Sequence, residues 1–199
     1  MTLADGYHDV PPGKVATVVT HLEMRHRPDT AAVPAPDGWD LVLHDRPQVP
    51  WYRDVFRAIG QDWLWFGRTV MDDDALAAII QDPKVQVLTL QRNGVDGGLL
   101  ELDFREPGQC ELTYFGLTAP LIGSGAGRFL MNAAIDRAWR AAITRFHVHT
   151  CTLDSPQALG FYRRSGFVPI RQQIEIADDP RLAHGYDRAL APHVPVFEG

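Results

Sequence analysis

The sequence predicts a single α/β domain built on one mixed, mostly antiparallel sheet with helices packed against it. Its 199 residues suit one ordinary domain, and no obvious linker divides them. Three β-rich segments separated by turns follow one another between residues 85 and 117, which indicates an antiparallel meander. After residue 123 the pattern changes to helix, strand, helix and strand, which is typical of parallel crossover units.

Each element is expected from its local pattern. Trp51, Val55 and Ile59 recur at helical spacing. The acidic run 72–74 supplies a side chain that can accept from the free N–H groups of a helix's first turn. Asn93-Gly94 is a turn signal within the meander. In chain order, the expected elements are a strand at 15–19, a short strand at 41–43, a helix from 51, a helix at 72–80, strands at 85–90, 99–104 and 109–117, a helix at 129–141, a strand at 145–151, a helix at 155–164 and a strand at 167–176.

The composition excludes several classes of protein. With 45% apolar and 22% charged residues, the chain has the composition of a folded globular protein. Its net charge is -6 and its basic residues are scattered, so it lacks the basic stripe of a nucleic-acid binder. It has two cysteines, no signal-like stretch after Met1 and no run of about 18 apolar residues. We therefore expect a cytoplasmic protein with no nucleic-acid or membrane partner.

A glycine-rich turn lies between a predicted strand and an amphipathic helix, where backbone N–H groups and the positive helix end favour an anion. A Walker-type loop would need Lys followed by Ser or Thr after the last glycine, and a dinucleotide fingerprint would need glycine at residue 128. A coenzyme A pyrophosphate loop and a plain strand-to-helix turn both stay open on this segment alone. The turn consists of Ile122, Gly123, Ser124, Gly125, Ala126, Gly127 and Arg128.

A second motif follows this turn at a defined distance. The run from Ala158 to Phe167 reads Ala-Leu-Gly-Phe-Tyr-Arg-Arg-Ser-Gly-Phe. It resembles the Ala-x-x-Phe-Tyr-x-x-x-Gly-Phe signature of the GCN5-related N-acetyltransferase (GNAT) superfamily. The segment 122–127 resembles the [Gln/Arg]-x-x-Gly-x-[Gly/Ala] loop of the same superfamily. The order and spacing of the two motifs make the resemblance specific.

The resemblance implies a GNAT-like fold and an acetyl-CoA-dependent N-acetyltransferase. Residues 85–176 would form the coenzyme-binding core, and residues 51–84 would form the variable acceptor-side helices. The resemblance does not identify residues 1–50, which contain an N-terminal strand and an irregular segment, or the irregular tail 177–199.

The resemblance also implies a set of coenzyme contacts. The N–H groups of residues 123–128 would bind the pyrophosphate. Ile122 stands where the family prefers Gln or Arg, so we expect weaker rather than lost binding. Asp154 stands where many members have Asn, which puts its contact with the coenzyme arm in question. The backbone that would pair with the pantetheine arm, in the splay between two strands, is that of Phe115, Gly116, Leu117 and Thr118.

Acetyl transfer to an amine requires a neutral nucleophile. An alkyl amine has a pKa of about 10.4, so deprotonating it at pH 7 costs about 4–5 kcal/mol, and a base or water chain is expected. Glu111 is the first candidate base, because the resemblance assigns a catalytic glutamate to this offset before the loop; a solvated surface carboxylate is the alternative. Glu101 and Asp103 share a face of the preceding strand and are alternative relays. Tyr162 matches the tyrosine that members often place near the coenzyme sulfur, and it is the candidate general acid, with a packing role as the alternative.

Two other groups of residues could carry function. His147, His149 and Cys151 alternate along one strand and so share a face, but adjacent strand positions alone supply too few zinc ligands. We expect no metal, and histidines that are buried or hydrogen-bonded. Acceptor-side aromatics at helical spacing are more often core than pocket, and any that face a cleft would favour an aromatic, apolar or cationic amine. These aromatics are Trp51, Tyr52, Trp63 and Trp65.

The sequence therefore predicts direct acetyl transfer from acetyl-CoA to a small-molecule or peptide primary amine within a ternary complex. No Ser or Cys stands in a recognisable nucleophile setting, which disfavours a covalent route. Two alternatives stay open: a coenzyme-binding sensor without turnover, and an acyltransferase that uses another acyl chain or a hydroxyl acceptor. A homodimer through the last strand or the Pro-containing tail is also compatible with the sequence.

Overall fold

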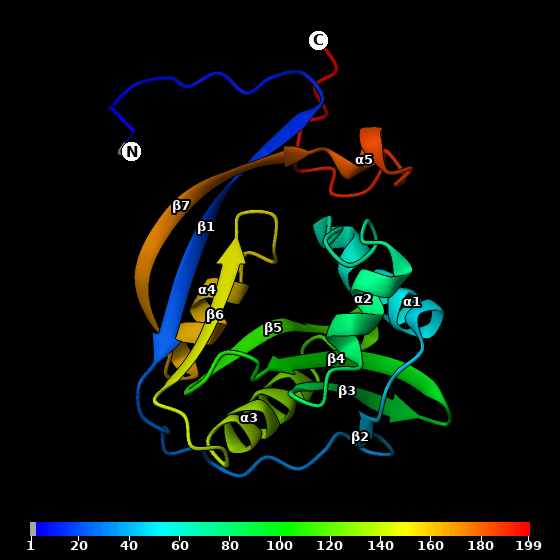
Figure 1. The fold of residues 1–199 in the computed structure, drawn as a ribbon, viewed down its shortest axis with the longest axis vertical. Helices are drawn as coiled ribbons and strands as arrows, with labels where there is room; N and C mark the ends of the chain where they lie inside the picture. Colours follow the sequence, from blue (N-terminus) through cyan, green and yellow to red (C-terminus); the bar gives the residue numbers. More distant parts are fainter. Residues whose placement is uncertain (1–2) are drawn as a thin grey trace.

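The computed structural model, which describes residues 3–199, has the predicted α/β architecture around one mixed sheet (Figure 1). Seven strands follow the order β2-β3-β4-β5-β6-β1-β7. The strands are β1 (Lys14–Met24), β2 (Asp40–His44), β3 (Val85–Arg92), β4 (Val95–Asp103), β5 (Gln109–Leu117), β6 (Arg145–Cys151) and β7 (Val168–Asp178). The helices are α1 (Val49–Gly60), α2 (Asp73–Ile80), α3 (Ala126–Ala138), α4 (Ala158–Arg164) and α5 (Pro180–Ala183).

Helices cover both faces of the sheet, so the core has two layers of apolar side chains. Along β3, Val85 and Val87 pack with α1 and α2, whereas Leu88 and Leu90 pack with α3. This division follows from the two-residue period of a strand, which sends alternate side chains to opposite faces. The β-rich, nearly all-apolar composition of β3 is therefore that of a strand buried on both sides.

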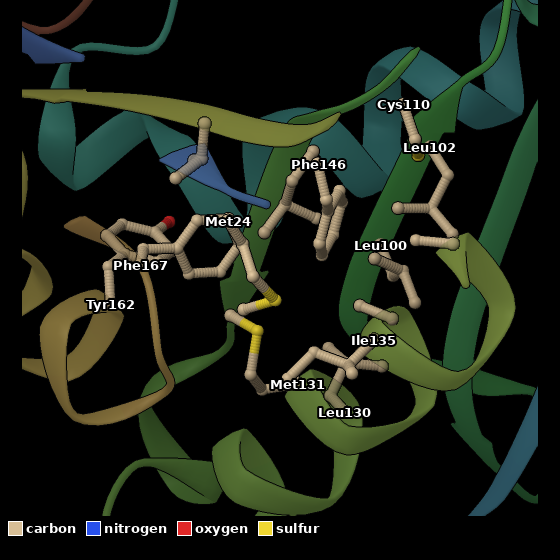
Figure 2. Close-up of a cluster of buried hydrophobic side chains, with 14 of the residues drawn as sticks. Met24, Leu100, Leu102, Cys110, Leu130, Met131, Ile135, Phe146, Tyr162 and Phe167 are labelled. Atoms are coloured by element: carbon tan, nitrogen blue, oxygen red, sulfur yellow. The ribbon is translucent and has the colours of Figure 1, made fainter. Parts of the chain in front are cut away.

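The larger apolar cluster joins elements that are far apart in the sequence (Figure 2). Met131 of α3 and Met24 at the end of β1 approach each other there, next to Phe146 of β6. The Phe167 ring packs at a tilt against that of Phe146, at a centroid distance of 5.1 Å. Burial of these side chains fixes α3 against the sheet, and with it the glycine-rich turn that precedes the helix.

The N-terminal strand has a position that the sequence did not indicate. β1 lies between β6 and β7 and pairs antiparallel with both of them. β6 and β7, which α4 connects, therefore run parallel as predicted. They are not neighbours in the sheet, however, because β1 lies between them. β5 and β6 are the parallel neighbours, and α3 connects them.

The hairpin between β3 and β4 differs in length from the prediction. Asn93 and Gly94 both have positive φ, 52° and 77°, as a two-residue turn of type I′ requires. The turn is thus complete at residue 94, and β4 begins at Val95 rather than at Leu99. Gly97 and Gly98 lie inside the strand, where Trp39 packs against the first of them.

Strands β5 and β6 separate soon after they begin. They pair only at Gln109 with Arg145, Cys110 with Phe146 and Glu111 with His147. Beyond Glu111, β5 contains an irregularity at Thr113, since Leu102 lies opposite Leu112 and Glu101 lies opposite Tyr114. The bulge bends β5 away from β6 and leaves a gap in the sheet at the site where the coenzyme arm was predicted.

Candidate active site

A cavity of about 490 Å³ occupies the gap between β5 and β6. Its walls come from the segment 63–67, from residues 112–117 of β5, from the glycine-rich turn, and from α4 together with the loop before it. The cavity is mostly apolar, with a few polar groups at each end, which is the usual composition of a small-molecule site.

The glycine-rich turn forms one end of the cavity and is positively charged. Gly125 precedes α3 with a φ of 91°, a conformation that favours glycine. Among residues 3–199, the N–H groups of Gly123, Gly125 and Gly127 donate no backbone hydrogen bond. They are therefore available to an anion at the positive end of the helix.

Two arginines reinforce the charge at this end. Arg128 and Arg164 line the cavity, and neither is paired with a carboxylate among the described residues. The Arg128 guanidinium donates to Ser165 Oγ at 3.0 Å and lies 5.1 Å from the centroid of the Phe161 ring. It is thus held against α4, with its charge still uncompensated.

Most of the residues predicted to contact a coenzyme border this cavity. Phe115, Gly116 and Leu117 do so on β5, as do Ile122, Gly123, Gly125, Gly127 and Arg128 in the turn, and Asp154 before α4. Thr118, Ser124 and Ala126 do not line it. Thr118 donates to Gly97 O, Ser124 donates to Leu121 O, and Ala126 is fully buried. Their roles are to shape the turn.

Tyr162 projects from α4 into the boundary between the core and the cavity. Its side chain is 7% exposed and packs edge-on against Phe115 and Phe167. Burial, and then the negative charge of Asp154, raise the pKa of the Tyr162 hydroxyl well above its usual value. Among the described residues the hydroxyl has no hydrogen-bond partner, so it is a protonated donor that a ligand in the cavity can use.

His149 of β6 lines the opposite end of the cavity, and Glu111 of β5 stands behind it. The His149 Nδ1 atom is 3.5 Å from Glu111 Oε1. This contact raises the pKa of His149, and the same contact lowers the pKa of Glu111. An Nδ1–H directed at the carboxylate leaves Nε2 of the neutral ring free to accept a proton. Glu111, the predicted base, does not itself line the cavity.

The two alternative relays lie away from the cavity. Glu101 is fully buried and accepts hydrogen bonds from the Tyr52 hydroxyl and the Arg68 guanidinium. Asp103 is bound by Arg105 Nη2 at 2.6 Å, which holds its pKa below the usual range despite partial burial. Neither side chain reaches the cavity. Glu101 instead anchors α1 and the acceptor-side segment to β4.

The predicted acceptor-side aromatics divide between core and cavity. Tyr52 is fully buried, and Trp51 donates to Asp96 outside the cavity. Trp63 and Trp65 line the cavity. Trp65 donates from Nε1 to Asp154 Oδ1 at 3.1 Å.

Asp154 and the C-terminal tail fix the acceptor side in place. Asp154 Oδ2 accepts from Thr150 Oγ1 at 2.7 Å and from the Cys151 N–H at 3.0 Å. The Tyr186 hydroxyl donates to Trp65 O at 2.7 Å. The tail thus contacts the segment that carries the cavity's tryptophans, a contribution that the sequence patterns did not indicate.

The histidines on β6 do not form a metal site with their neighbours. Among residues 3–199, no group of three or more His, Cys, Asp or Glu side chains could hold a metal ion. His149 contacts Glu111, and its ring lies 5.8 Å from that of His21, measured between centroids. Nor does any helix of the described residues have the length and apolar character needed to cross a membrane.

The fold is that of the acyl-CoA N-acyltransferases. The model of the acetyltransferase (GNAT) family matches residues 43–167, which is more than half of the chain. The chain therefore belongs to the GNAT family. No curated protein sequence matches it.

Several solved structures share the fold at low sequence identity. A GCN5-related N-acetyltransferase from Sphaerobacter thermophilus is 15% identical, with a TM-score of 0.61 over 85% of this chain and 53% of its own. A putative GNAT-family acetyltransferase from Novosphingobium aromaticivorans is 15% identical, with a TM-score of 0.58 over 84% and 67%. A tandem GNAT protein from the clavulanic acid biosynthesis pathway is 16% identical, with a TM-score of 0.58 over 86% and 55%. The chain spans just over half the length of the first and third of these.

Proposed function

We propose that the protein is an acetyl-CoA-dependent N-acetyltransferase that transfers acetyl directly to a primary amine. The observation that carries this proposal is the polarity of the cavity. One end has three unpaired glycine N–H groups and two uncompensated arginines, whereas the other has tryptophans, a carboxylate and a histidine. The first end suits an anionic coenzyme, and the second suits an organic cation.

The coenzyme end has the donors that a pyrophosphate requires. The N–H groups of Gly123, Gly125 and Gly127 would bind its oxygens, with Arg128 and Arg164 nearby as counter-charges. Within the splay, Thr113 Oγ1 is buried and has no hydrogen-bond partner among the described residues. A buried hydroxyl without a partner costs free energy, and a pantetheine amide would satisfy it. This orphaned group supports a polar, elongated ligand between β5 and β6.

The acceptor end supplies a path for the amine's proton. A primary ammonium near His149 loses a proton to Nε2, and Glu111 stabilises the imidazolium that forms. The neutral nitrogen then attacks the thioester carbonyl carbon, and the C–S bond breaks as the tetrahedral adduct collapses. The second proton of the nitrogen replaces the proton that Tyr162 gives to the departing thiolate. Cys151 also lines the cavity, but burial raises the pKa of its thiol, which favours direct transfer over an acetyl-cysteine intermediate.

The Tyr162 hydroxyl is proposed to protonate the departing thiolate. Tyr162→Phe removes only this donor and retains the aromatic packing, so turnover is expected to fall about 10- to 100-fold while the Kd for acetyl-CoA changes little. Steady-state kinetics and calorimetric titration with acetyl-CoA separate the two quantities. An unchanged turnover number would remove Tyr162 from the mechanism.

The walls of the acceptor end favour an amine on an apolar or aromatic body. Trp63, Trp65 and Phe66 supply flat apolar surface, and the charge of Asp154 lies beside Trp65. An ammonium group held near a carboxylate and over an indole ring is stabilised by both. We therefore expect arylalkyl amines to be better acceptors than short aliphatic amines or amino acids, whose carboxylate Asp154 would repel.

A thiol-release screen with acetyl-CoA tests the proposal. Arylalkyl amines, polyamines, amino acids and peptide N-termini are compared, and release of free coenzyme A is expected with the first group. Tight binding of acetyl-CoA without release by any amine would contradict the proposed activity and favour a sensor. Release that is faster with another acyl-CoA, or with a hydroxyl acceptor, would replace the acetyl or the amine part of the proposal.

A variant of the glycine-rich turn tests the coenzyme end separately. A Cβ at Gly127 would lie 3.6 Å from Leu117, an ordinary contact, so Gly127→Ala is expected to fold and bind normally. Gly127→Val places further methyl groups in the space for the pyrophosphate. It is expected to weaken acetyl-CoA binding about 100-fold, which corresponds to losing one or two hydrogen bonds to a charged group. Equal affinities of the two variants in a calorimetric titration would place the pyrophosphate elsewhere.

A further inference from the structure

Strand β7 leaves an apolar sheet face and a long edge open to solvent. It pairs only with β1, and it is the last strand of the sheet (Figure 1). Ile174 and Ile176 are both 51% exposed, and their partners across the ladder, Val18 and Ala16, are exposed as well. These four side chains share one face, because alternate residues of paired strands point the same way. We call them the β7 patch.

The edge is only partly protected: β7 carries the charges of Arg171, Glu175 and Asp178, but it is long and has a single proline. Edge strands in monomeric proteins are usually short, or carry charges or proline. The opposite edge of this sheet, β2, follows that rule with five residues. In contrast, β7 has eleven residues, and its only proline, Pro169, lies at one end. An open backbone ladder next to exposed isoleucines is the composition of an interface.

The charges on β7 are complementary to those of a second β7. Arg171 and Glu175 form no ion pair among the described residues. They are four positions apart on one strand, about 13 Å, which is too far for them to pair with each other. In an antiparallel pair of β7 strands centred on Gln173, however, each Arg171 lies directly opposite the Glu175 of the second copy.

This register also places the apolar side chains of the two copies on one side of the joined sheet. Residues 172, 174 and 176 of one strand lie opposite 174, 172 and 170 of the other, all of the same parity, so both copies of the β7 patch fall on the same side of the joined sheet. The two-fold axis passes midway between the two copies of Gln173, perpendicular to the sheet, as an isologous contact requires. A register centred on Ile174 would instead place Arg171 opposite Ala177. Charge thus selects one register.

We propose that the protein forms a homodimer in which two β7 strands pair antiparallel about Gln173, with reciprocal Arg171–Glu175 contacts and a shared apolar face. The two seven-stranded sheets then become one continuous sheet, and no open β7 edge is left. Glu175 also lines the active-site cavity, but the test of this assembly is separate from that of the proposed acetyl transfer, because it measures mass rather than turnover.

Sedimentation equilibrium tests the assembly, and a charge exchange tests its register. The wild type is expected at twice its chain mass of 22.2 kDa. The single variants Arg171→Glu and Glu175→Arg each place like charges opposite one another twice, so each should weaken the dimer about tenfold or more. An equimolar mixture of the two variants restores opposite charges at both contacts, and it should recover the affinity of the wild type. The double variant in one chain should recover it as well.

Ile174→Lys tests the patch without depending on the charge pairs. The side chain is half exposed, so the fold should tolerate lysine, whereas the dimer should be lost. Val95→Lys is the matched control, since Val95 is 64% exposed in the β3–β4 hairpin and should leave the dimer intact. A wild type that remains monomeric at tens of micromolar would overturn the proposal. A dimer that neither the charge variants nor Ile174→Lys weaken would overturn it equally, because its interface would lie elsewhere.

Discussion

His149→Gln is expected to lower the turnover number about 100-fold or more, the usual contribution of a general base. Glutamine keeps a polar side chain of similar size on β6 but cannot accept the amine's proton. The Kd for acetyl-CoA should change little, because the glycine-rich turn lies at the other end of the cavity. Turnover is measured with the best amine from the thiol-release screen. His26→Gln is the control, since His26 is exposed and distant from the cavity.

Glu111→Gln is expected to change the pH dependence of the reaction as well as its rate. The base must be neutral, so kcat/KM should rise as pH increases through the pKa of His149. The Glu111 carboxylate raises that pKa, with smaller contributions of the same sign from Asp154 and Glu175, while burial opposes them. Removing the Glu111 charge lowers the pKa of His149, so the acid limb of the profile should move to lower pH.

The pH profile separates this mechanism from the simpler one in which Glu111 is itself the base. If Glu111 acted directly, the acid limb would be that of the Glu111 carboxyl, and Glu111→Gln would lower kcat/KM at every pH and abolish the limb instead of moving it. If His149 had no role, His149→Gln would retain the wild-type limb. Either profile would contradict the proposed proton path.

The shape of the cavity around the glycine-rich turn could be predicted because it depends on residues that are close in the sequence. The glycine-rich turn specifies its own conformation, as the φ of 91° at Gly125 illustrates, and the strand before it was expected at the residues where it is found, Gln109–Leu117. The acceptor half depends on contacts between distant segments. The alternating pattern of β6 predicts that His149 shares a face with His147 and Cys151. It does not indicate that Glu111 stands beside His149, because the register of β5 against β6 depends on residues far apart in the sequence.

The position of β1 was unpredictable for a similar reason. Its apolar pattern indicates a strand, yet nothing local in residues 14–24 indicates that it separates β6 from β7. That arrangement depends on contacts such as Thr17 Oγ1 with Thr152 Oγ1, which are 2.9 Å apart in space and 135 residues apart in the chain. Likewise, Tyr52 and Trp65 are both acceptor-side aromatics, but one lies in the core and the other in the cavity. Aromatic composition alone does not distinguish them.

Arg68→Met is expected to destabilise the protein by about 3–5 kcal/mol, because it leaves the buried Glu101 without its counter-charge. The Glu101 side chain is fully buried and that of Arg68 is 9% exposed. After the substitution only the Tyr52 hydroxyl would bind the Glu101 carboxylate, in a setting that excludes water. The free energy of unfolding is measured by urea titration. Methionine fills much of the volume of the arginine stem, so the loss reports charge rather than a cavity.

An exposed pair supplies the comparison for this experiment. Arg27 and Asp136 are 2.6 Å apart but 57% and 41% exposed, so Arg27→Met should cost about 1 kcal/mol or less. Adding Glu101→Gln to Arg68→Met should restore part of the lost stability, since the unpaired buried charge is then removed. If Arg68→Met cost no more than Arg27→Met, water must reach Glu101. That carboxylate would then be open to the acceptor side, and its role as a proton relay would need to be reconsidered.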